Sequence, residues 1–218
     1  MDFGRSSRRA DGSFVPVALK ILVAGGFGVG KTTLVGSVSE LPPLQTEEVL
    51  TDASIGTDDL AGVETKSKTT VVMDFGRITI TEDVVLYLFG TPGQDRFWFL
   101  WDELALGALG AIVMADTRRL ADCFPSVDYF ERRGTPFLVA VNCFNGEQRH
   151  TPDKVREALD LDPHVPVVLC DARDRQSGKH VVVTLVEHVK TSTRRPPAKI
   201  PPPEIPPAKI PSIMTWRS

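Results

Sequence analysis

The segment Gly25-Gly-Phe-Gly-Val-Gly30-Lys31-Thr32 decides the fold of this chain. It matches the pattern G-x-x-x-x-G-K-S/T without a mismatch. The apolar run Val17–Ala24 leads into it, and a helical stretch from Lys31 to Glu40 leaves it. The backbone N–H groups of such a turn point inward at an anion, and the following helix adds the positive end of its dipole. The sequence therefore predicts a cradle for the phosphates of a nucleoside triphosphate.

The residues of this cradle divide into backbone donors and two side chains with specific tasks. We expect the nucleotide to contact Gly25, Gly26, Phe27, Gly28, Val29, Gly30, Lys31, Thr32 and Thr33. The Lys31 ammonium is placed to reach the β- and γ-phosphates, so it is also a candidate catalytic residue, and the Thr32 hydroxyl is a candidate Mg²⁺ ligand. The motif alone names neither the base nor the fate of the γ-phosphate.

Apolar runs of strand length alternate with helical stretches along the rest of the chain. The predicted strands are Val17–Ala24, Ile78–Ile80, Val84–Phe89, Ala108–Ala115, Pro136–Val141 and Val165–Cys170. The predicted helices are Lys31–Glu40, Phe97–Leu106, Val127–Arg133, Pro152–Leu159 and Ser177–Lys190. This alternation predicts an α/β fold, the three-layer sandwich of P-loop NTPases, with a mostly parallel central sheet and helices on both faces.

Composition and charge exclude several classes of protein. The chain has 218 residues and a formal net charge of −3, and residues 21–189 hold 15 basic against 25 acidic side chains. An acidic body argues against nucleic acid as the main partner. The three cysteines are too few and too widely spaced for a disulfide scaffold or a zinc knuckle, which favours a cytoplasmic protein. The longest charge-free apolar run, Leu104–Ala115, is too short to span a bilayer, so we expect no integral membrane segment.

The two ends of the chain differ from its centre. We expect a disordered N-terminal arm over 1–15, a nucleotide-binding domain over 16–190 and a proline-rich disordered tail over 191–218. Eight of the 17 prolines lie between Pro196 and Pro211, where Pro-Pro-Ala-Lys-Ile-Pro occurs twice. Proline lacks an N–H and fixes φ, which prevents helix or central strand here. The tail is either a plain solvated segment or a ligand for a proline-reading domain.

Two downstream motifs carry a resemblance to a known family. The first is Thr69-Thr70-Val-Val-Met-Asp74, and the second is Leu88-Phe-Gly-Thr-Pro-Gly93-Gln94. A threonine upstream of a strand, followed by Pro-Gly-Gln after the next strand, is the order seen in small GTPases. Over about residues 17–190 the chain resembles the Ras-like superfamily, and more closely its bacterial MglA-type and conservon-type small GTPases.

The resemblance implies roles for these motifs. Thr70, or its neighbour Thr69, would bind Mg²⁺ through its hydroxyl and touch the γ-phosphate through its backbone. Gly93 would donate its N–H to the γ-phosphate, and Gln94 would orient the attacking water. Thr70 and Gln94 are therefore candidate catalytic residues. One departure matters: the usual acidic residue that holds Mg²⁺ through water is replaced by Gly90. In MglA-type proteins an aspartate on the preceding strand is thought to substitute, and Asp74 matches it here.

The base-reading segment also departs from the family. Guanine is usually read by Asn-Lys-x-Asp, and the matching segment here is Asn142-Cys143-Phe144-Asn145. Asn142 fits the pattern, whereas Cys143 lacks the lysine stem that would lie along the base. Asn145 places an NH₂ donor where guanine needs a second acceptor, which costs about 1.5–3 kcal/mol. Ala172 would offer its backbone N–H to the guanine O6 by resemblance to the Ser-Ala-Lys loop.

The function that the resemblance implies is a GTP/GDP-binding, Mg²⁺-dependent molecular switch in bacterial signalling. It would hydrolyse GTP slowly and change its switch loops to control partner binding. Its expected partners are a roadblock-domain (MglB-like) regulatory protein and a sensor kinase complex at the membrane, to which it would attach peripherally. Two alternatives stay open: a nucleotide-binding scaffold with weak or no hydrolysis and relaxed base specificity, and a nucleotide kinase or ATPase on the same cradle. Trp98 and Trp101 read either as partner-binding aromatics or as helix core.

Overall fold

A computed structural model describes residues 16–42, 44–50, 69–93, 99–146 and 150–192. Its strands are β1 (Val17–Ala24), β2 (Leu44–Leu50), β3 (Thr69–Thr81), β4 (Val84–Gly90), β5 (Ala108–Ala115), β6 (Phe137–Asn142) and β7 (Val167–Cys170). Its α-helices are α1 (Lys31–Val38), α2 (Phe99–Ala105), α3 (Phe124–Arg133), α4 (Pro152–Ala158) and α5 (Arg175–Ser192). Short 3₁₀ helices lie at η2 (Leu120–Cys123) and η3 (Phe144–Gly146). The predicted N-terminal arm, Gln94, Trp98 and residues 193–218 of the predicted tail lie outside the described residues.

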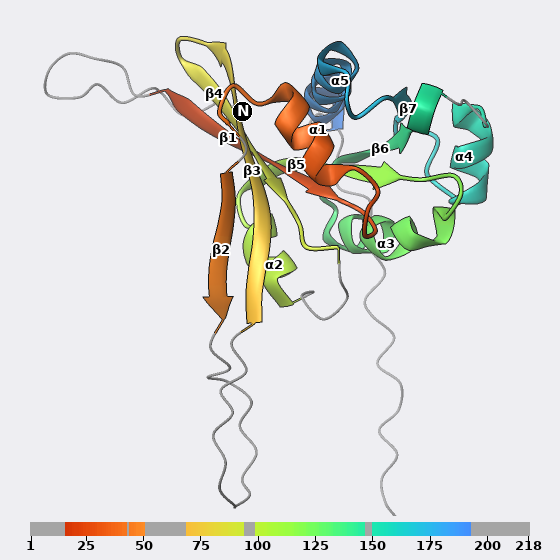
Figure 1. Cartoon of the computed structure of the whole chain (residues 1–218). Helices are drawn as coiled ribbons and strands as arrows, with labels where there is room; N and C mark the ends of the chain where they lie inside the picture. Colours follow the sequence, from red (N-terminus) through yellow and green to blue (C-terminus); the bar gives the residue numbers. More distant parts are fainter. Residues whose placement is uncertain (1–15, 43, 51–68, 94–98, 147–149, 193–218) are drawn as a thin grey trace, which may run out of the picture.

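One sheet with the order β2-β3-β4-β1-β5-β6-β7 forms the centre of the molecule (Figure 1). The strands from β4 to β7 in that order pair in parallel, while β3 pairs antiparallel with β4 and β2 antiparallel with β3. The predicted fold class, a mostly parallel α/β sandwich, is confirmed. Because parallel strands share a direction, the loops after β1, β5, β6 and β7 all leave the sheet at the same edge.

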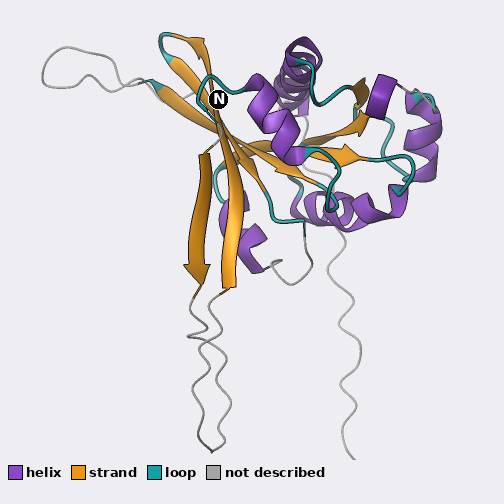
Figure 2. Ribbon diagram, in the orientation of Figure 1, coloured by secondary structure: helices purple, strands orange, loops and turns teal. Residues whose placement is uncertain are grey.

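Helices cover both faces of this sheet (Figure 2). On one face, α1 and α5 bury a core that includes Leu34, Val38, Val181 and Leu185. The methyl groups of Val38 lie so close to Gly178 of α5 that a side chain there would overlap them, which brings the two helices into direct contact. The tight packing fixes the position of α1, whose first residue follows the phosphate cradle.

The second face carries α2, α3 and α4 over a separate apolar cluster. Trp101 of α2 is 2% exposed and lies edge-on to Tyr129 of α3, with ring centroids 5.1 Å apart. Trp101 is therefore a core residue, and its interpretation as a partner-binding aromatic is wrong. No helix in the described part of the chain has both the length and the apolar character that a membrane crossing requires.

The largest difference from the prediction lies at the antiparallel edge. β3 begins at Thr69 rather than at Ile78, and it pairs residue by residue with the unpredicted strand β2, from Leu44↔Phe75 to Leu50↔Thr69. The sequence of β2 has no alternation of apolar and polar residues that would signal a strand. Its strand conformation comes instead from backbone pairing with β3. Smaller differences occur at helix ends: α5 extends from Arg175 to Ser192, past both predicted limits.

Candidate functional site

The loop between β1 and α1 has the shape of a phosphate cradle because neighbouring strand ends press against it. Gly25 has φ +130°, and a Cβ there would overlap the carbonyl oxygen of Met114 in β5. Gly30 has φ +108°, and a Cβ there would lie 2.6 Å from Nδ2 of Asn142 in β6. Both positions demand glycine for conformation and for space. α1 begins at Lys31 directly after this loop, and its N-cap, Gly30, makes no side-chain hydrogen bond, as expected of a helix start that serves an anion.

Lys31 is buried inside this loop. Its Nζ donates to the carbonyl oxygens of Gly25 and Gly26, both at 2.8 Å. Burial lowers the pKa of Lys31 to about 8, and the charge of Asp74 opposes part of that shift. Gly93, which follows β4, approaches so closely that a Cβ there would lie 2.6 Å from Lys31 Nζ. The structure thus brings the predicted γ-phosphate residues Lys31 and Gly93 together.

Asp74 lies on β3 beside the first turn of α1. Thr32 Oγ1 donates to Asp74 Oδ2 at 2.7 Å. A Cβ at Gly90 would lie 2.8 Å from the same carboxylate oxygen. The Asp74 carboxylate therefore occupies the space into which a side chain at position 90 would project.

Thr32 and Asp74 together supply oxygen ligands of the kind that Mg²⁺ prefers. No group of three or more His, Cys, Asp or Glu side chains that could hold a metal occurs in the described ranges. A divalent cation here would consequently need phosphate oxygens and water to complete its shell, which is the usual arrangement for Mg²⁺ in nucleotide sites. The residues present fit a metal that arrives with a nucleotide.

Two predicted catalytic residues are not placed in this cluster. Thr70 lies in β3, where its backbone pairs with Val49, about 13 Å along the strand from Asp74. The structure does not bring Thr70 to the cradle. Gln94 lies just beyond the last described residue of its loop, Gly93. Of the remaining cradle residues, Val29 is buried, whereas Phe27 is 70% exposed at the crest of the loop and Thr33 is exposed.

Asn142 connects the cradle to the end of β7. Its buried side chain donates from Nδ2 to the Val29 carbonyl at 3.0 Å, and its Oδ1 accepts the Ala172 N–H at 3.1 Å. The Ala172 N–H expected to meet the base is thus already bonded, so a ligand would have to replace this bond. Asn145 is exposed, with a left-handed φ of 58°, three residues further along. The base-reading segment therefore begins with a buried, hydrogen-bonded residue, Asn142, and ends with an exposed one, Asn145.

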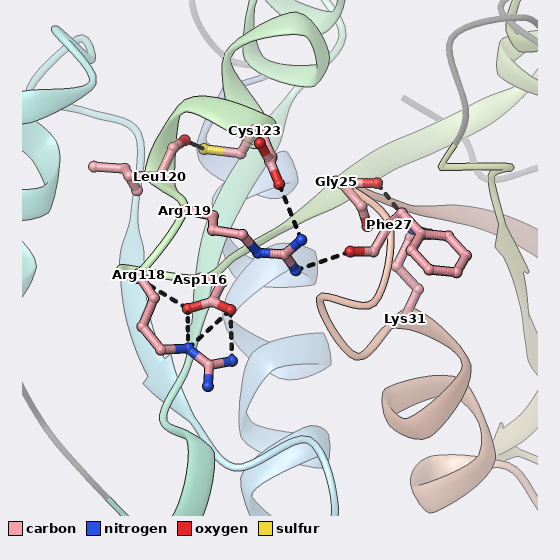
Figure 3. Close-up of polar contacts among 10 residues, drawn as sticks. Gly25, Phe27, Lys31, Asp116, Arg118, Arg119, Leu120 and Cys123 are labelled. Atoms are coloured by element: carbon pink, nitrogen blue, oxygen red, sulfur yellow. Dashed lines mark hydrogen bonds and ion pairs between the residues drawn. The ribbon is translucent and has the colours of Figure 1, made fainter.

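Sequence reasoning missed the loop that follows β5 (Figure 3). Arg119 donates from Nη2 to the carbonyl of Phe27 at 3.0 Å, and its Nη1 pairs with Asp122 Oδ2 at 3.6 Å. Asp122 in turn lies where a side chain at Gly26 would project, at 2.7 Å from the Cβ position. Just before it, Asp116 accepts from Arg118, which lowers the pKa of that carboxyl. The sequence did contain a signal for this loop, since the charged residues Asp116, Arg118 and Arg119 directly follow the apolar strand β5, which lies next to β1 in the sheet.

Comparison with known proteins agrees with this geometry. A family model described as "Conserved hypothetical ATP binding protein" matches residues 23–192. An uncharacterized protein of Methanocaldococcus jannaschii is 33% identical over 101 residues, which are 46% of this chain and 53% of that protein. The chain thus spans about half the length of this curated relative.

Solved structures with the same fold include G domains of FeoB iron transporters. The T. maritima G domain is 16% identical with a TM-score of 0.52, covering 81% of this chain and 99% of that one. The G domain from Methanococcus jannaschii is 14% identical with a TM-score of 0.51, covering 79% and 98%. At this identity the likeness shows the fold alone, which is that of a P-loop GTPase-like domain.

The two asparagines of the base-reading segment differ in burial, which leads to opposite expectations for stability. Asn142→Ala leaves the Val29 carbonyl and the Ala172 N–H without their partner, so the free energy of unfolding should fall by about 2 kcal/mol. Asn145→Gly keeps the left-handed backbone accessible and should leave it nearly unchanged. Urea denaturation of both variants measures this difference. Equal stabilities would show that the Asn142 bridge contributes nothing to the fold.

Proposed function

Because the chain belongs to the family described as conserved hypothetical ATP binding proteins, we propose that it is a nucleotide-dependent switch. It binds GTP with Mg²⁺, hydrolyses it slowly and changes partner affinity between the triphosphate and diphosphate states. The observation that carries the proposal is the gathering of Lys31, Thr32, Asp74 and Gly93 at the mouth of one loop. Three separate segments of the chain, the start of α1, β3 and the loop after β4, supply the chemistry that a bound triphosphate requires.

The phosphates are held by the backbone of the loop and by Lys31. The Lys31 ammonium exchanges its bonds to the Gly25 and Gly26 carbonyls for phosphate oxygens, which are stronger acceptors because they are charged. Thr32 would hold a Mg²⁺ ion through its hydroxyl and Asp74 would hold it through water, and the ion would offset the charge of the phosphates. The Gly93 N–H contacts the γ-phosphate, and Gln94 orients the water that attacks it.

The switching itself follows from which segments contact the γ-phosphate. Thr70 and Gly93 come from two segments on the β3–β4 side of the cradle, and loss of the γ-phosphate releases both. Thr70 must move toward the cradle to bind, since β3 holds it about 13 Å from Asp74. We propose that a roadblock-domain regulatory protein and a membrane sensor kinase complex read this change, which would place the protein in the cytoplasm and, through its partners, at the membrane.

A second candidate is a nucleotide-binding scaffold with weak hydrolysis and relaxed base specificity. Asn145 favours it, because an exposed amide lacks the charged acceptor pair that selects guanine. The family description, which names ATP rather than GTP, points the same way. Base competition and a hydrolysis assay separate the two candidates.

Removing the Lys31 ammonium should weaken nucleotide binding. Lys31→Ala loses a charge-assisted bond to phosphate, so affinity for a fluorescent GTP analogue with Mg²⁺ should fall about 10- to 150-fold. Lys154→Ala, which changes an exposed lysine on α4, is the matched control and should bind like the parent. Competition with GDP, ATP and XTP on the parent protein then ranks the bases. Undiminished binding by Lys31→Ala would refute the proposed site.

A carboxylate at position 90 should partly replace the carboxylate of Asp74. Asp74→Ala is expected to reduce the gain in nucleotide affinity that Mg²⁺ provides by about tenfold, with little effect on binding in EDTA. The double variant Asp74→Gly/Gly90→Asp removes the Cβ of residue 74, which would otherwise lie 2.9 Å from a Cβ at position 90, and it puts a carboxylate back into the same space, so it should recover part of that gain. Titrations with and without Mg²⁺ measure both effects. A Mg²⁺-dependent gain that survives in Asp74→Ala would remove Asp74 from the metal site.

Hydrolysis distinguishes the switch from the scaffold. We expect single-turnover phosphate release from GTP at a rate on the order of 10⁻⁴ s⁻¹ in the parent protein. Gln94→Leu cannot orient water and should slow release further while nucleotide affinity stays the same. If the parent releases no phosphate even with its partner present, the scaffold is the correct function.

A further inference from the structure

We propose that Arg118 is the purine-stacking residue of the nucleotide site, held in place by Asp116 and Phe144. The inference rests on the proposed function, since it assumes a nucleotide whose phosphates lie in the cradle. Arg118 would supply the contact with the face of the base that the base-reading segment lacks, because Cys143 stands in place of the lysine whose stem would lie along the base.

The arrangement of the sheet sets the direction in which the base must lie. Asp74 and Gly93, the residues at the metal and γ-phosphate end, belong to β3 and to the loop after β4, on one side of β1. The ends of β5, β6 and β7 lie on the other side of β1. A nucleotide with its γ-phosphate at the first group therefore extends its sugar and base over the second, where Asn142 already touches the cradle.

Arg118 is a large side chain of that second group whose position is fixed by several contacts. Asp116 is 4% exposed and accepts from the Arg118 backbone N–H at 2.9 Å, from Nε at 2.9 and 3.1 Å, and from Nη2 at 2.7 Å. This bidentate pairing occupies one edge of the guanidinium and leaves the orientation of its plane determined (Figure 3). Asp116 is thus a positioning residue.

Phe144 provides the second contact. The Arg118 Cζ lies 4.1 Å from the centroid of the Phe144 ring, and the Arg118 side chain is still 47% exposed. Phe144 stands between Cys143 and Asn145, so the aromatic ring that Arg118 lies over belongs to the base-reading segment. A planar, partly accessible cation therefore lies beside the expected position of the base without having to be ordered by the ligand.

The chemistry of this pair predicts what it would recognise. A guanidinium stacks on the face of any aromatic base, and such stacking depends on ring area rather than on the pattern of donors and acceptors. Arg118 should therefore favour purines over pyrimidines and treat adenine and guanine alike. That selectivity agrees with Asn145, which offers no charged acceptor pair to guanine.

Base-free and base-containing ligands test the inference. We would titrate inorganic tripolyphosphate, ATP, GTP and UTP, each with Mg²⁺, against the parent and Arg118→Ala. The variant should lose about tenfold in affinity for ATP and GTP, less for UTP, and none for tripolyphosphate. Arg118→Lys keeps the charge but not the plane, and it should resemble Arg118→Ala. Arg132→Ala, which removes an exposed arginine paired with Asp128 on α3, is the matched control and should behave like the parent.

Phe144→Leu is a second variant that removes the ring but leaves Arg118 and Asp116 intact, and it should show the same selective loss. The inference is overturned if the ratio of nucleotide to tripolyphosphate affinity is unchanged in the folded variants. An equal loss for all ligands also overturns it, because Arg118 would then only brace the loop. A parent protein that binds none of these ligands overturns the proposed function, and the inference with it.

Discussion

The shape of the phosphate loop depends on contacts that neighbouring residues make with its glycines. Met114 of β5 fills the space beside Gly25, Asp122 lies against Gly26, and Asn142 of β6 lies against Gly30. Flexible glycines would otherwise cost conformational entropy when the loop is ordered. Contacts with Met114, Asp122 and Asn142 offset this loss of entropy when the chain folds. The loop therefore has its shape before any ligand binds.

Charge in the site is distributed between the two sides of β1. On the β3–β4 side, the Asp74 carboxylate occupies the space beside Gly90 and accepts a hydrogen bond from Thr32. On the β5–β7 side, Arg118 pairs with Asp116, and Arg173 pairs with Asp171 at 2.8 Å, which lowers the pKa of the Asp171 carboxyl to about 2. Arg118 and Arg173 are thus each bound to a carboxylate two residues before them, so neither presents an uncompensated charge.

The sequence predicted local features well and cross-strand features poorly. The cradle, β1, β5 and the start of α4 follow from short-range signals such as the glycine spacing and Thr151-Pro152. Asp74 could be assigned beside Gly90 only through the family resemblance. β2, the contact of Arg118 with Phe144 and that of Arg119 with Phe27 depend on which strands become neighbours in the sheet, and no residue near them in sequence carries that information. Gln94 lies outside the described residues.

The Asn142 amide connects the phosphate loop to the loop that would hold the base in the proposed site. One side chain holds the Val29 carbonyl of the phosphate loop and the Ala172 N–H of the loop after β7. Any ligand group that competes for either bond alters the other, and thermodynamic reciprocity requires that the influence be equal in both directions. In the proposed site, a ligand at the base end would therefore act on the triphosphate end through a single buried carboxamide, between the loops that follow β1 and β7.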